Sequence, residues 1–184
     1  MNASARVLLA HAADPAAPAL DTMLFARLVG ARMESHDLHW LGLDGAELAA
    51  LTHRHFPGAT LGPVPVALVP DAHRVFVRAL HGLLMWHDRT ATRHREDAHC
   101  LATIIAAASL RPDHLWRDLG LAGRDDVTEM LTRHYPELVA RNVANLRWKK
   151  FLAQEVAHAQ GVAPTCAPGC PGCEDYAFCY PDNR

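Results

Sequence analysis

The stretch Thr165-Cys-Ala-Pro-Gly-Cys-Pro-Gly-Cys-Glu-Asp-Tyr-Ala-Phe-Cys-Tyr180 divides this 184-residue chain into two unlike parts. Residues 161–184 hold four of the five cysteines, many prolines and glycines, and almost no aliphatic side chains. Such a segment cannot build a hydrophobic core of its own, so we expect an irregular tail that a bound metal orders. Gly161, followed by Pro164, is typical of the end of a helix. We therefore predict a helical domain over residues 1–160 and a cysteine-rich, cluster-binding tail over residues 161–184.

The first 160 residues carry helical periodicity throughout. Valine, isoleucine, threonine and aromatic residues never form the alternating runs of a strand, and half of all residues are hydrophobic, enough for a core. The fold class predicted is all-α, a compact helical domain with an irregular metal-binding tail. Helices are expected at about 19–34, 44–55, 71–109 with a break near Thr90–Thr92, 113–119, 125–134 and 137–160, and a loop at 57–70.

Composition and charge exclude several functions. The formal net charge of −2 gives no basic surface for nucleic acid or for an anionic membrane. No apolar run reaches the roughly 18–20 residues that span a bilayer, and the first twenty residues lack the apolar core of a secretory signal. We therefore expect a cytoplasmic protein that binds neither nucleic acid nor membrane. In a reducing compartment, clustered thiols are metal ligands or redox groups more often than disulfides.

The four tail cysteines follow the spacing Cys166-x3-Cys170-x2-Cys173-x5-Cys179. Thiolates are the soft ligands that iron–sulfur clusters and zinc select, and a tight run of four is an iron–sulfur pattern, although this spacing is neither of the common ferredoxin spacings. Structural zinc usually takes two pairs separated by about 12–20 residues, a wider spacing than this one. The pattern favours a metal–sulfur cluster, with a zinc-stabilised interaction module and disulfides as alternatives. A redox enzyme that uses the cluster for electron transfer is a third possibility.

Two parts of the chain resemble each other. Leu41-Gly-Leu43 is followed by Arg54-His-Phe-Pro57, and Leu119-Gly-Leu121 is followed by Arg133-His-Tyr-Pro136. Each copy reads as a turn, a short helix and an aromatic–proline stop. We interpret His55 and His134, at equivalent points, as structural ends of helices.

Two other features are interpreted as structural. The Glu-x-x-His step at Glu96–His99 is typical of di-iron helix bundles, but no second step exists, so interhelical or solvated histidines are favoured. Cys100, in an apolar helical stretch, is expected to be a small buried hydrophobe.

Several segments together resemble the NifQ family, in order from about residue 20 to 181. The most specific are Asn145-Leu-Arg-Trp-Lys-Lys-Phe151 and the run Cys173-Glu-Asp-Tyr-Ala-Phe-Cys179 with its preceding cysteines. Supporting stretches are His114-Leu-Trp-Arg-Asp-Leu-Gly-Leu121, Arg133-His-Tyr-Pro136, and Leu41-Gly-Leu43 to His55-Phe-Pro-Gly58.

The resemblance implies a nitrogen-fixation accessory protein, not a turnover enzyme, and no catalytic residue is predicted. Family members carry a molybdenum–iron–sulfur cluster, for which a 3Fe-4S or 4Fe-4S cluster is a candidate precursor. They supply molybdenum, as a metallochaperone, for assembly of the nitrogenase iron–molybdenum cofactor. The implied partners are the cofactor scaffold complex, the nitrogenase iron protein, and molybdate or another molybdenum donor. The implied cluster and metal ligands are Cys166, Cys170, Cys173 and Cys179.

The first cysteine gap departs from the family. It has three residues, where the family usually has four, and this puts the role of Cys166 in question. Arg147, Lys149 and Lys150 precede the tail by about twenty residues and would favour an anionic cluster or incoming molybdate. The interpretation that we favour for these three residues from sequence is nevertheless a solvated helix face.

Overall fold

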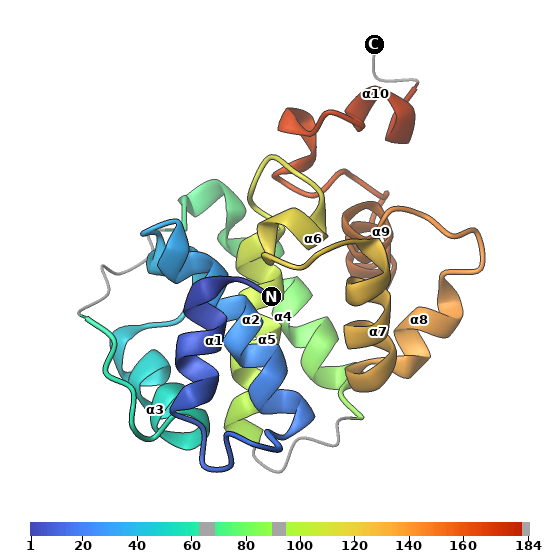
Figure 1. Ribbon diagram of the computed structural model, residues 1–184. Coiled ribbons are helices and arrows are strands. Elements are labelled where there is room, and N and C mark those ends of the chain that lie inside the picture. The colour runs from blue at the N-terminus through green and yellow to red at the C-terminus, as the bar shows by residue number, and fades with distance from the viewer. Residues whose placement is uncertain (63–68, 90–94, 182–184) are drawn as a thin grey trace.

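The computed structural model describes residues 1–62, 69–89 and 95–181, and within those ranges every regular element is a helix. The all-α prediction is confirmed (Figure 1). None of the described helices is both long and apolar enough to cross a membrane. The elements are α1 (Ala3–Ala10), α2 (Leu20–Glu34), the 3-10 turn η1 (Leu38–Leu41), α3 (Gly45–His55), α4 (Asp71–His87), α5 (Arg95–Ala108), α6 (Leu115–Asp118), α7 (Arg124–His134), α8 (Pro136–Arg141), α9 (Trp148–Gln160), the 3-10 turn η2 (Cys170–Gly172) and α10 (Tyr176–Cys179).

Helix α5 forms the centre of the body. Ten of its residues are buried, and five of them are alanines, whose small side chains let neighbouring helices approach closely. It packs against α3, α4 and η1, and α4 packs in turn against α9. Leu101 and Ile105 are fully buried in the single large core cluster. The body therefore has one core, to which α9 is joined through α4.

The first half of the chain follows the sequence prediction closely. Helix α3 begins with a capping box, in which Asp44 and Glu47 bond each other's backbone N–H at 2.8 Å. Helix α1 was not predicted. Asn2 caps it, and it packs on α2 where a side chain at Gly30 would lie 2.6 Å from the Ala5 nitrogen. The predicted break near Thr90–Thr92 and the middle of the predicted 57–70 loop lie outside the described residues.

One predicted helix is wrong. The chain does not continue as a single helix over residues 137–160 but leaves α8 after residue 141 and begins α9 at residue 148. Asn145 has a positive φ of 51°, a conformation that ends helices. The Asn142 side chain bonds both the N–H and the carbonyl of Leu146, at 2.8 and 3.0 Å, and Arg124 donates to the same carbonyl. These local bonds replace the helical ones.

The internal repeat is confirmed as a repeat of backbone conformation. Phe56 and Tyr135, which follow α3 and α7, have nearly equal angles, φ −138° and ψ 63° against φ −135° and ψ 54°. His55 and His134 are the last residues of the two helices, and both are buried. Both face α2, where His55 bonds the Thr22 hydroxyl at 3.0 Å. The two histidines are structural helix ends, as predicted.

His134 is expected to make stability depend on pH. Burial, with the nearby charge of Arg133, lowers its pKa to about 4, against the opposing effect of Asp21, whereas an unfolded histidine titrates near 6.5. The unfolded chain therefore binds this proton first, so stability is complete above about pH 6.5 and is lost as the pH falls toward 4. The loss should total about 3 kcal/mol, at roughly 1.4 kcal/mol per pKa unit. Urea unfolding at several pH values should show His134→Gln flattening this slope, and exposed His158→Gln keeping it.

Candidate functional site

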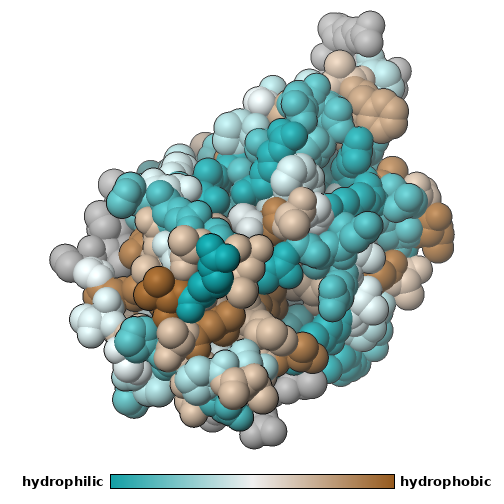
Figure 2. All heavy atoms as spheres, in the orientation of Figure 1, coloured by the Kyte–Doolittle hydropathy of each residue, from teal (hydrophilic) through white to brown (hydrophobic). Residues whose placement is uncertain are grey.

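The cysteine tail leaves α9 and passes over the α6 end of the body before it projects from the molecule (Figure 1). Its irregular character is confirmed, with only the short turns η2 and α10. Ala167 and Cys170 are buried against Ala153 of α9, and Phe76 of α4 packs on the same cluster. Hydrophilic side chains cover most of the flank between the body and the tail (Figure 2). The tail is therefore seated on the body, while the need for a metal to order it stays a prediction.

Two glycines allow this close seating. The Gly169 N–H donates to the Ser109 carbonyl at 3.1 Å. A Cβ at Gly169 would lie 1.9 Å from the Arg111 carbonyl oxygen, and a Cβ at Gly172 would lie 2.4 Å from the Pro112 side chain. The backbone of the tail thus touches the segment that follows α5 at a distance that only glycine permits.

The two lysines of α9, Lys149 and Lys150, lie where the tail meets the body. Lys149 is only 5% exposed, and its ammonium donates to the Arg111 carbonyl at 2.7 Å and to the Asp118 carboxylate. Lys150 donates to the Cys179 carbonyl and lies over the Tyr180 ring, 4.9 Å from its centre. The solvated-face interpretation is therefore wrong for Lys149. Its stem and charge are enclosed because the segment after α5 folds over them.

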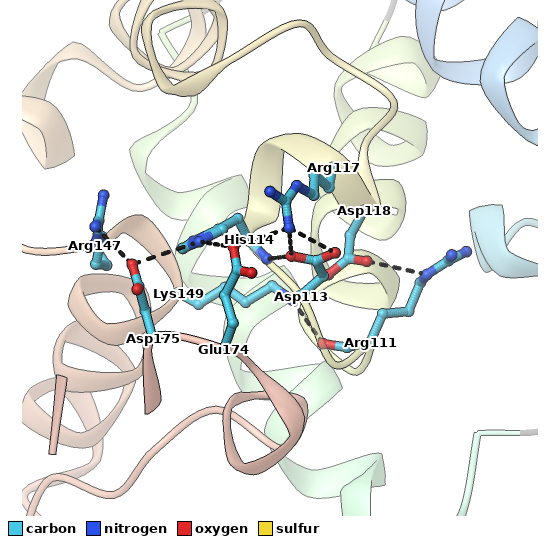
Figure 3. A network of polar contacts seen from close by, with 9 residues as sticks. All are labelled: Arg111, Asp113, His114, Arg117, Asp118, Arg147, Lys149, Glu174 and Asp175. Atoms are coloured by element: carbon cyan, nitrogen blue, oxygen red, sulfur yellow. Dashed lines mark hydrogen bonds and ion pairs between the residues drawn. The ribbon is translucent and has the colours of Figure 1, made fainter. Parts of the chain in front are cut away.

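An acidic pair in the tail is clamped by basic side chains of the body (Figure 3). Glu174 accepts from Arg117 at 3.0 Å, and Asp175 accepts from Arg147 at 2.6 Å. The His114 Nε2 lies 3.4 Å and 3.5 Å from these two carboxylates. Because the pair stands between Cys173 and Cys179 in sequence, these contacts fix the position of the second half of the cysteine motif.

The structure brings three of the four predicted ligands to one pocket. Cys170, Cys173 and Cys179 line a pocket between the tail and the start of α9. Cys166 instead packs beside Cys170 in the small Ala153 cluster, outside the lining of that pocket. All the cysteines are free thiols, so the disulfide alternative receives no support. Cys166, whose role the shortened first cysteine gap puts in question, is thus also the cysteine that lies outside the pocket.

The environment of Cys170 keeps its thiol protonated in the metal-free chain. Burial raises its pKa to about 11, against the opposing effect of the Lys149 charge. Beside it, the Tyr180 hydroxyl is buried without a hydrogen bond of normal geometry. A bound metal would favour the thiolate, and an unpartnered buried hydroxyl is a donor available to a ligand in this place.

The thiols are not gathered around a single point. In the part of the chain that the structure describes, only Asp113, His114 and Glu174 place three metal-binding atoms within 4.8 Å of one another, and no three thiols do so. Thiolates around one tetrahedral zinc, each about 2.3 Å from the metal, lie roughly 3.8 Å apart. The thiols of the described residues therefore do not form a ready-made tetrahedral site for one ion.

The remaining histidine and cysteine predictions are confirmed as structural. His99 Nδ1 lies 3.0 Å from His81 of α4, and its Nε2 lies 2.9 Å from Glu47 of α3, so it is an interhelical histidine. Cys100 is buried in α5, and burial raises its pKa to about 11.

Sequence reasoning gave no role to several residues that hold the site. These residues are His114, Arg117, Asp118, Arg124 and Tyr180. The first three lie in the His114–Leu121 stretch, whose resemblance to the family was the one available signal.

Fold and site together define an all-α protein with a four-cysteine tail seated on its helical body. The family model described as NifQ matches residues 20–181. A "Protein NifQ homolog" of Sinorhizobium fredii is 38% identical over 141 residues, covering 76% of this chain and 60% of its own length. "Protein NifQ" of Rhodobacter capsulatus is 37% identical, covering 76% of this chain and 75% of its own, and that of Azotobacter vinelandii is 35% identical, covering 76% of each. No solved structure matches.

The chain belongs to the NifQ family. Membership associates it with nitrogen fixation and with the processing of molybdenum for nitrogenase.

Replacing Gly169 tests the seating of the tail. Gly169→Ala should separate the tail from the body, because the new methyl group would overlap the Arg111 carbonyl. Hydrogen exchange of residues 163–181 should speed up at least tenfold while the body stays protected. Gly45→Ala, where nothing lies within 4 Å of the new Cβ, is the control. Unchanged tail protection in Gly169→Ala would contradict the docked arrangement.

Replacing Lys149 tests the buried ion pair. Lys149→Met should lower the free energy of unfolding by about 2 kcal/mol, because it removes the buried bond to the Asp118 carboxylate, which keeps only its ion pair with Arg111 at 3.2 Å. Lys150→Met, which breaks no ion pair, should cost less than about 1 kcal/mol. Urea unfolding of the double variant with Asp118→Asn should recover at least about 1 kcal/mol. Strict additivity of the two single losses would argue against the pair.

Proposed function

We propose that this protein is a molybdenum and iron–sulfur cluster carrier that supplies molybdenum for assembly of the nitrogenase iron–molybdenum cofactor. The observation that carries the proposal is that a tail with four free cysteines lies against the basic side chains at the start of α9, in a chain of the NifQ family. The cargo would be a molybdenum–iron–sulfur cluster held by Cys166, Cys170, Cys173 and Cys179. The function is transfer, and no turnover chemistry is assigned.

The chemistry of the donor set supports this cargo. Thiolates suit iron and molybdenum–sulfur centres. Lys149 and Lys150 line the same pocket as three of the cysteines, Lys150 bonds the Cys179 carbonyl, and both add positive charge beside an anionic cluster. The buried Tyr180 hydroxyl is a hydrogen-bond donor for a cluster sulfide or for an oxygen on molybdenum. Such second contacts tune and protect a cluster.

The attachment of the tail suits a carrier that must release its load. Three of the four cysteines are partly exposed, and the tail is held mainly by ion pairs and backbone contacts, with a small apolar cluster. Partially exposed ion pairs are worth little individually, roughly 0–1 kcal/mol. A partner can therefore detach the second half of the motif without unfolding the body. The proposed recipients are the cofactor scaffold complex and the nitrogenase iron protein, in the cytoplasm, with molybdate or another donor as the source.

Metal analysis of the whole chain tests the proposal. Protein purified without oxygen from cells given iron and molybdate should contain iron, acid-labile sulfide and molybdenum. About one zinc per chain without sulfide, after anaerobic reconstitution as well, would instead establish the zinc-stabilised interaction module. Zinc is spectroscopically silent and redox-inert, so colour and oxygen lability separate the two at once.

Single cysteine variants test the ligand set. Cys170→Ala, Cys173→Ala and Cys179→Ala should each lose more than half of the bound iron, because these thiols line one pocket. Cys166→Ala should keep more iron than these three, because Cys166 lies outside the pocket. Cys100→Ala, buried in α5, is the matched control with full iron content. Equal iron loss in all four tail variants would mean that no ligand is specially labile.

A further inference from the structure

The pocket that Cys170, Cys173 and Cys179 line can also bind a ligand through groups other than thiols. Opposite the cysteines it is lined by the side chains that open α9 and by one arginine of α7. Its charged lining consists of four cations, Arg124, Arg147, Lys149 and Lys150, and two carboxylates, Asp113 and Asp175.

Most of these charges are already neutralised. The ion pairs are Lys149–Asp118, Arg147–Asp175 and Asp113–Arg117. Arg124 and Lys150 form no ion pair with any residue that the structure describes. The pocket therefore presents two uncompensated positive charges, which equals the charge of a dianion.

The contacts of these two cations are all to neutral groups. Arg124 donates to the Asn145 and Leu146 carbonyls at 3.1 and 2.9 Å and to the Asn145 side chain at 2.6 Å. Burial and the nearby charge of Arg147 lower its pKa. Lys150 donates to the Cys179 carbonyl. Asp125 opposes this shift in the pKa of Arg124 without forming an ion pair with it, so both cations remain able to bind an anion.

The pocket is large enough to hold a small oxyanion. Its volume is about 50 Å³, and a water-sized group needs roughly 10–15 Å³ on this scale. It thus has room for about three to five such groups, comparable to the four oxygens of a tetrahedral oxyanion. In addition, α9 has neither a side-chain cap nor an acidic residue in its first turn, so no carboxylate of its own competes there.

We propose that this pocket is a subsite for a tetrahedral divalent oxyanion, molybdate, which Arg124 and Lys150 hold beside the Cys173 and Cys179 thiols. The identity of the oxyanion as molybdate rests on the proposed function; the charge, the size and the lining of the subsite do not. The subsite differs from the cluster site in its ligands, which are guanidinium and ammonium groups instead of sulfur. It would keep molybdenum as an oxyanion next to the thiols.

Equilibrium dialysis of the metal-free, full-length chain with molybdate tests the subsite. The wild-type chain should bind about one molybdate, and Arg124→Gln and Lys150→Gln should each weaken binding roughly tenfold, the size of one lost charge-assisted hydrogen bond. Arg124→Lys, which keeps the charge, should stay within about threefold of wild type. Arg78→Gln removes an equal charge from an exposed position of α4 and should leave binding unchanged. Circular dichroism checks that each variant is folded.

Several results would overturn the subsite. These are no molybdate binding at millimolar concentration, equal weakening by Arg78→Gln, and sulfate binding where molybdate does not bind. Iron and sulfide uptake by the wild type and by Arg78→Gln is measured separately and should be equal, because Arg78 lies outside the site. Molybdate binding without cluster uptake in the wild type would refute the carrier and keep the oxyanion subsite. Cluster uptake without molybdate binding would refute the subsite alone.

Discussion

The buried ammonium of Lys149 is the interaction on which the rest of the site depends. It joins the Arg111 carbonyl to the Asp118 carboxylate, and so ties the segment after α5 to the last residue of α6. That segment is the surface that Gly169 and Gly172 touch. The Asp118 carboxylate also pairs with the Arg111 side chain at 3.2 Å, and without Lys149 the buried carboxylate would lose one of two positive partners. The position of the cysteine tail therefore depends on this small buried network of Lys149, Asp118 and Arg111.

The contacts of the tail differ in kind along its length. Around Ala167 and Cys170 it is buried against α9 and α4, whereas from Glu174 onward it is held by ion pairs and ends in the exposed Phe178. The first part should thus be the more stable, and the second should open locally at low cost. This gradient runs through the cysteine motif. A cluster bound there would have one firmly placed side, at Cys170, and one side that can be presented to a partner.

Much of this arrangement could be predicted from the sequence, and the failures have physical causes. The helix end at residue 160 and the aromatic–proline stops are local signals, and both are confirmed in position, while the metal site that the cysteine spacing predicts stays a prediction. The break before α9 was missed because the apolar pattern continues across it, while the chain turns at Asn145 through side-chain bonds of Asn142. Lys149 was assigned to a solvated face because lysine is rarely buried. Its partners lie more than thirty residues away, and a helical pattern carries no information on them.

The same reasoning explains why the charged residues of the pocket are not equivalent. Arg147 already binds Asp175, so an anion that engaged Arg147 would compete with the contact that seats the tail. Among the described residues, Arg124 and Lys150 have no carboxylate in an ion pair to give up. An incoming dianion can therefore be held by these two residues while the tail stays docked, and the thiols of Cys173 and Cys179 stay beside it. The pairing of Arg147 and the lack of pairing of its neighbours separate the role of seating the tail from the role of attracting an anion.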